Sequence, residues 1–66
     1  MDVKEFQDAW NNGHSIIDND YAIVIIKGDI RIYCDNYSIE RLNFVYFYRN
    51  HRLIGVAHLD DIITVL

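Results

Sequence analysis

The strongest constraint on the fold is one aromatic segment, Leu42-Asn43-Phe44-Val45-Tyr46-Phe47-Tyr48. Six of its seven residues are apolar or aromatic, and Phe, Tyr and Val favour the pleated, half-buried surface of a β-sheet. A polar tetrapeptide, residues 49–52, separates this segment from a second apolar run, Leu53–Leu59. The pattern predicts a strand, a tight turn and a second strand.

The length of 66 residues predicts a single small domain over residues 1–66. Hydrophobic residues make up 52% of the chain, which is rich for so short a sequence. Two explanations stay open: a dense β core, or a surface that a second copy covers. The single cysteine, Cys34, excludes an internal disulfide.

The net charge of −4 disfavours direct binding to nucleic-acid backbones and to anionic membranes, which attract clusters of Lys and Arg. The longest apolar run, Tyr21–Ile26, is far shorter than the roughly 20 residues that cross a bilayer. No basic leader followed by an apolar stretch opens the sequence. With its lone thiol, the chain is expected in the cytoplasm.

A helix is expected over residues 2–12. Asp2 and Glu5 have the spacing of a capping box, and Gly13 suits the end of a helix. The apolar residues share one face: Val3, Phe6 and Trp10. This face predicts a helix that covers a sheet, with a partner-binding helix as the alternative.

Strands are expected in five places, joined by turns at Lys27-Gly28-Asp29 and Asn50-His51. The expected strands are Tyr21–Ile26 (covered on both faces), Ile30–Cys34 (half exposed), 42–48, Leu53–His58 and Ile62–Leu66. For residues 35–43 we expect a loop with one helical turn, or else an early start of the third strand near Ser38. A short helix over residues 60–66 is the alternative to the last strand.

The fold class is therefore α+β: an N-terminal helix packed on an antiparallel sheet of about five strands, curled or forming a small open barrel. No proline blunts the sheet edges. An exposed edge such as residues 62–66 would invite pairing with another chain.

No catalytic, cofactor or metal site is expected. The three histidines lack the close spacing of metal motifs: His14, His51 and His58. Cys34 shares a strand face with Ile30 and Ile32, which predicts a buried thiol with a raised pKa. Asp18-Asn19-Asp20 opens like a calcium loop, but Ile23 stands where that loop needs glycine.

The aromatic segment suggests a binding surface. Phe44-Val45-Tyr46-Phe47 resembles the tail of the RNA-recognition-motif signature, but Arg41-Leu42-Asn43 replaces the basic and glycine residues that should precede it. If Val45 and Phe47 face the core, the other aromatics face outward as an interface, beside Tyr33. The opposite parity would bury them instead, and the sequence leaves both open.

In size and composition the chain resembles the short acidic proteins of phages and mobile elements, anti-CRISPR inhibitors among them. The leading hypothesis is an inhibitor that blocks a basic, nucleic-acid-handling host enzyme by stoichiometric binding in the host cytoplasm. The candidate partner-binding residues are Tyr33, Phe44, Tyr46, Tyr48, Asp18, Asp20, Asp60 and Asp61. The alternatives are a homo-oligomer built through the aromatic strand and a free sheet edge, such as a homodimer, and a binder of RNA or single-stranded nucleic acid.

Overall fold

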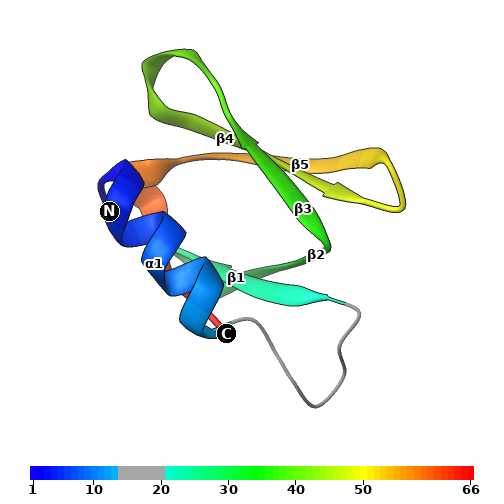
Figure 1. Ribbon diagram of the computed structural model, residues 1–66, viewed down its shortest axis with the longest axis horizontal. Coiled ribbons are helices and arrows are strands. Elements are labelled where there is room, and N and C mark those ends of the chain that lie inside the picture. The colour runs from blue at the N-terminus through cyan, green and yellow to red at the C-terminus, as the bar shows by residue number, and fades with distance from the viewer. Residues whose placement is uncertain (14–20) are drawn as a thin grey trace.

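A computed structural model describes residues 1–13 and 21–66 of the chain. One helix precedes six strands and two short 3₁₀ turns (Figure 1). In chain order the elements are α1 (Val3–Gly13), β1 (Ala22–Ile26), β2 (Ile30–Cys34), β3 (Asn36–Ile39), η1 (Arg41–Asn43), β4 (Phe44–Arg49), β5 (Arg52–His58), η2 (Leu59–Asp61) and β6 (Ile62–Val65).

The strands form two antiparallel sheets of three strands each, in the orders β2-β1-β6 and β3-β4-β5. In Figure 1 the two sheets lie one above the other, and α1 lies along one side of the pair. Asp35 alone separates β2 from β3, and its N–H donates to the Tyr48 carbonyl of the second sheet. The chain thus passes from the first sheet to the second at Asp35 and returns to the first sheet through η2.

The core lies between the inner faces of the two sheets and is closed by α1. Alternate residues of β1 and β4 are buried, as a period of two predicts. The fully covered side chains of largest volume are Phe6, Phe47, Leu59, Val24, Val45 and Cys34. Phe6 brings α1 into this core, because its ring meets Tyr37 edge-on at 4.8 Å and lies 6.3 Å from Phe47.

The predicted helix is confirmed together with its capping box. The Glu5 N–H donates to Asp2 Oδ1 at 2.8 Å, and the Asp2 N–H donates to Glu5 Oε1 at 3.2 Å. These two bonds satisfy donors that every helix start leaves without a partner. The helix packs against the core between the sheets, and Phe6 is its one fully buried side chain.

The α+β class is confirmed, but the curled sheet or small open barrel is wrong. Neither sheet is closed or curled, and residues 1–13 and 21–66 contain six strands. The additional strand is β3, which lies in the stretch where we favoured a loop with one helical turn. The helical turn is real but short, and it is η1. Because the chain bends at Asp35 instead of continuing to pair with β2, the strands divide into two sheets.

Three strand assignments differ in detail. Leu42 and Asn43 belong to η1 and not to the strand, which begins at Phe44. The outer residues of β1 are half buried, so this strand is fully covered on its inner face alone. In β2, Cys34 is buried as expected, whereas Ile30 is 56% exposed because it lies beside the β1–β2 turn.

The C-terminal strand β6 is an edge, as expected, but the end of α1 lies against it. Leu66 exchanges backbone hydrogen bonds with Ile23 of β1, so the neighbouring Val65 carbonyl points away from β1. A Cβ atom added at Gly13 would collide with this Val65 carbonyl. Gly13 therefore permits a close approach between the helix end and the edge of β6.

This contact predicts that Gly13→Ala destabilises the protein, although alanine favours helices more than glycine does. The obstacle is backbone, so relief requires a shift of the whole helix end. We expect a loss of roughly 1–3 kcal/mol in the free energy of unfolding, typical of overpacking. Urea denaturation measures it, with the exposed helix substitution Gln7→Ala as the control. Equal or greater stability of Gly13→Ala would contradict the contact.

Candidate protein-binding face

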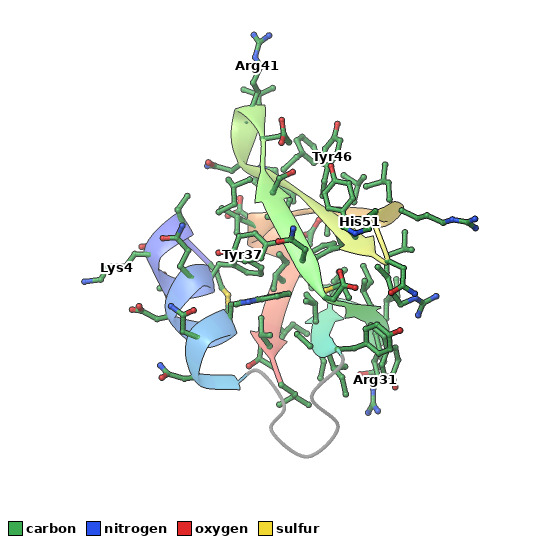
Figure 2. The ribbon with its side chains drawn as sticks, turned by 45° about the vertical axis from the view of Figure 1, so that its right-hand side comes forward. Lys4, Arg31, Tyr37, Arg41, Tyr46 and His51 are labelled. Carbon is green, nitrogen blue, oxygen red and sulfur yellow. The ribbon has the colours of Figure 1, made fainter. Side chains whose placement is uncertain are left out.

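The structure resolves the parity of the aromatic strand. Val45 and Phe47 are fully buried, so the alternate residues of β4 point to the opposite side of the sheet. Figure 2 shows Tyr37 on the side of α1 and Tyr46 on the far side. We call this far side the aromatic face, and its residues are Phe44, Tyr46, Tyr48, Val56 and His58.

Strand pairing holds the aromatic face together. Phe44 lies opposite His58 and Tyr46 opposite Val56 in the β4–β5 ladder. The rings of Phe44 and His58 meet edge-on with their centroids 5.1 Å apart. Two of its apolar side chains are open to solvent, Phe44 at 40% and Val56 at 47%. Large side chains in such a cross-strand array offer contact area with little entropy left to lose on binding.

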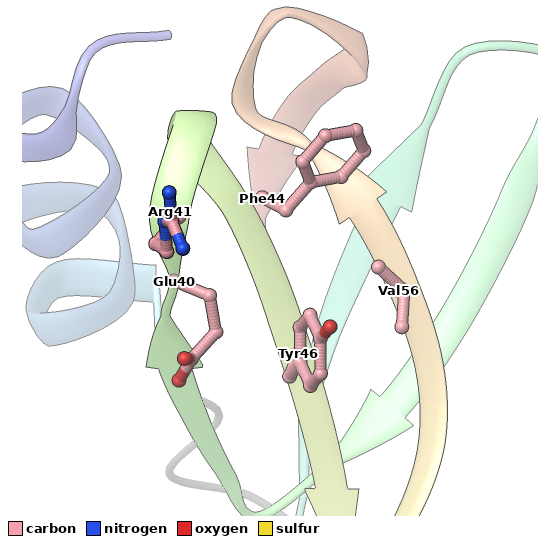
Figure 3. Close-up of a pocket in the computed structure, with 5 residues that line it drawn as sticks. All are labelled: Glu40, Arg41, Phe44, Tyr46 and Val56. Carbon is pink, nitrogen blue, oxygen red and sulfur yellow. The ribbon is translucent and has the colours of Figure 1, made fainter.

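A shallow hollow of about 360 Å³ opens on the aromatic face. Figure 3 shows the side chains of Phe44, Tyr46 and Val56 around it, with Glu40 and Arg41 of the β3–β4 connection at its rim. The hollow therefore combines an apolar floor with one anionic and one cationic side chain. A hollow of this composition could accept an apolar side chain on its floor and a polar group of the same molecule at its rim.

Leu42 extends the apolar surface at the tip of the same connection. Its side chain is 81% exposed, and its backbone has φ 60° and ψ 28°. This left-handed conformation is unfavourable for a branched side chain. Because the side chain is exposed, burial of apolar surface does not offset that cost. Asn43 follows with φ 62°, a conformation that asparagine tolerates better.

The two neighbouring aspartates of η2 separate in space. The Asp60 N–H donates to His58 Nδ1 at 3.0 Å, which places Asp60 beside the aromatic face. The Asp60 carboxylate lies 3.5 Å from the same ring nitrogen. Asp61 instead meets Lys27 Nζ at 3.8 Å, on the β1–β2 turn of the other sheet.

The structure thus brings together part of the expected binding set. Phe44, Tyr46 and Tyr48 share the aromatic face, and Asp60 borders it. Tyr33 lies on β2 in the other sheet, where it is 43% exposed, and Asp61 lies toward that sheet. Asp18 and Asp20 lie outside the described residues.

Sequence reasoning missed three contributors to this surface: Val56, His58 and Leu42. The strand over Leu53–His58 was expected, but its pairing with β4 contains a bulge between Phe47 and Tyr48 that shifts the register. Gly55 at this point was the available signal, because glycine within a strand often marks a bulge.

A second hollow lies at the far end of β4, with a volume of about 280 Å³ and a lining of Asp35, Asn36, Tyr48 and His51. Asp35 Oδ2 accepts the Asn50 N–H at 2.9 Å. The carboxylate therefore ties the β4–β5 turn to the bend between the sheets, which is a structural task. Asn50 and His51 in that turn have φ of 53° and 67°, as two-residue hairpin turns require.

Cys34 is fully buried against the core, as predicted. Burial, with a smaller contribution from the nearby Asp35 carboxylate, raises the pKa of its thiol to about 12. The thiol is therefore protonated at neutral pH, which suits a packing residue and not a nucleophile.

In the described ranges no group of three or more His, Cys, Asp or Glu side chains is arranged to hold a metal ion. The helix that the structure describes is too short and too polar to span a membrane. Comparison of the chain with models of protein families, with curated proteins and with solved structures finds no match.

The state of Cys34 predicts slow alkylation of the folded protein. At pH 8 its raised pKa leaves a thiolate fraction roughly a thousandfold below that of an ordinary cysteine. We expect iodoacetamide to modify the native protein at least a hundredfold more slowly than the protein in urea, as followed by mass spectrometry. As pH rises from about 9 toward 12, the folded protein shields Cys34 from alkylation less well. In this range the thiol ionises in the unfolded chain before it ionises in the folded protein, so the free energy of unfolding falls. Fast native modification at pH 8 would contradict the burial.

Proposed function

We propose that this chain is a small protein-binding module whose aromatic face docks on a protein partner. The observation that carries the proposal is the array of Phe44, Tyr46 and Val56 around an open hollow on the outer face of the second sheet. Apolar side chains in such an array remain open to solvent although the same sheet buries Val45 and Phe47 on its other side. Exposed apolar patches rimmed by polar residues are typical of protein interaction sites.

The charge of the surroundings suggests the kind of partner. The chain carries a net charge of −4, and both Glu40 and Asp60 stand at the border of the aromatic face. Acidic residues around an apolar centre speed association with a basic surface, whereas the apolar centre supplies most of the binding free energy. We therefore propose stoichiometric inhibition of a nucleic-acid-handling enzyme, whose basic substrate-binding surface would be covered.

Docking through this face predicts a sharp dependence on two side chains. The immobilised protein should retain a nucleic-acid-handling enzyme from a host lysate, in an amount that saturates at one enzyme site per copy. Phe44→Ser or Tyr46→Ser should weaken this binding roughly thirtyfold, as loss of an interface anchor does. Ile63→Ser is the matched control, because Ile63 is also exposed, at 53%, but lies on β6.

Circular dichroism of each variant establishes that it is folded. Unchanged capture by Phe44→Ser and Tyr46→Ser would remove the aromatic face from the proposal. Retention of single-stranded oligonucleotides that falls steeply with salt would instead favour nucleic-acid binding through the same aromatics.

Leu42 offers a test that separates stability from binding. Leu42→Asn relieves the left-handed strain without loss of buried area, so we expect a gain of roughly 0.5–1 kcal/mol in the free energy of unfolding. If the exposed side chain contributes to docking, the same variant binds the captured enzyme more weakly. Thermal unfolding and surface plasmon resonance measure the two effects. A variant that is more stable and binds equally well would exclude Leu42 from the interface.

A further inference from the structure

Strand β5 is a long and uncovered sheet edge. It has seven residues, and among the strands that the structure describes it pairs with β4 alone. Its apolar side chains are open to solvent, Leu53 at 52%, Ile54 at 37% and Val56 at 47%. An edge of this kind is a template for a further strand.

Hydrogen bonds elsewhere in the sheet determine which backbone groups are free. Glu40 donates to the Phe44 carbonyl and Asp35 to the Tyr48 carbonyl, so these residues of β4 face β3. The alternate residues Val45 and Phe47 therefore face β5, where they pair with Ala57 and Gly55. Val56, between those two, directs its N–H and C=O away from β4 and toward the open edge.

The other edges of the described sheets are less suited to pairing. The end of α1 lies against β6 at Val65, as the collision at Gly13 indicates. Strand β3 has only four residues, and its Asn36 and Ser38 are polar. Strand β2 has five residues, of which the outward-facing Arg31 is charged. The edge with the most length and apolar area is β5.

The ends of β5 carry opposite charges. Arg52 begins the strand, and among the described residues no carboxylate lies within 4.0 Å of its guanidinium. Asp60 follows the strand in η2, where its side chain is 80% exposed. A strand with a cation at its start and an anion after its end complements an antiparallel copy of itself.

We propose that two copies of this chain pair antiparallel through β5 about a two-fold axis at Val56. The Val56 N–H and C=O of each copy would bond those of the other, the reciprocal arrangement that an isologous interface requires. In this register Ile54, the bulged residue of β5, falls near His58 of the second copy. Arg52 then lies at the same end of the pair as the second copy's Asp60, which follows β5 in η2. The charges at the ends of the strand are thereby matched twice.

Pairing in this register joins the two aromatic faces into one surface. Directly opposed residues of an antiparallel pair project to the same face, so the row Tyr46–Val56 continues into Val56 and Tyr46 of the second copy. The β3-β4-β5 sheets of the two copies become one sheet of six strands. This dimer does not rest on the proposed function, because it uses the edge of β5 and leaves Phe44 on the open face.

The proposal predicts a weak dimer, since a strand–strand interface is small. We expect a dissociation constant on the order of 10–100 µM by sedimentation equilibrium. R52E and D60R each place two like-charge pairs in the interface and should each weaken the dimer about tenfold or more. A mixture of R52E with D60R restores both opposite-charge pairs, so the mixed dimer should form as tightly as the natural one. R41E is the control, because it makes the same change of charge on η1 and not on β5 or beside its end.

A monomer at concentrations up to about 1 mM overturns the proposal, because pairing through a surface of this size would be populated there. Equal effects of R41E and R52E, or mixed variants that do not pair, overturn it as well. Loss of enzyme capture by Phe44→Ser in a protein that still dimerises would leave the two proposals separate.

Cross-linking tests the register directly. Opposed residues in a hydrogen-bonded antiparallel pair have Cα atoms roughly 5.5 Å apart, within the range of a disulfide. Val56→Cys should therefore form a covalent dimer under mild oxidation, whereas Leu42→Cys, which is more exposed, should not. Cys34 is buried and contributes no cross-link. Equal cross-linking of both variants, or no cross-link at Val56→Cys, overturns the pairing at Val56.

Discussion

The structure depends on the packing of Phe6 against the second sheet. Its ring is fully buried, with the Tyr37 ring 4.8 Å away on β3 and the Phe47 ring 6.3 Å away on β4. Trp10 extends the same contact, since its ring lies 4.7 Å from Tyr37. The two sheets of three strands leave an open side between them, and these aromatic rings on one helical face cover it. Burial of a ring of this size is worth roughly 2–3 kcal/mol, a large share of what so small a domain has.

Much of the fold follows from local sequence patterns. The helix, its capping box and the two hairpin turns were predictable because each depends on residues close in sequence: Asp2 with Glu5, Gly28 in one turn, and Asn50 in the other. The division into two sheets was not predictable, because it depends on a bend at Asp35 whose partner is the distant Tyr48 carbonyl. Likewise β3 contains Asn36 and Ser38, which disfavour strands, and it exists because β4 offers it a partner.

The candidate site was predictable in its aromatic part and not in its boundaries. Alternation along β4 restricted the parity to two choices, and burial of Val45 and Phe47 selects the outward set. Val56 and His58 belong to that set through a register that a bulge shifts by one residue. Gly55 signals such a bulge in the sequence, but it does not fix which residues pair beyond it. The acidic residues illustrate the same limit, since Asp60 and Asp61 are neighbours in sequence but turn toward different sheets.

The contact between Gly13 and Val65 also bears on how far an assembly of this chain could grow. With the edge of β6 obstructed by the helix end, the proposed pairing through β5 would use the longest edge of the described sheets and would stop at two copies. A change that lifts the end of α1 would uncover the edge of β6 as well, and a chain that pairs through two different edges can add copies without limit, as in a fibre. Glycine at residue 13 would then guard against polymerisation. A side chain added there that displaces the helix end would cause turbidity before any loss of helix.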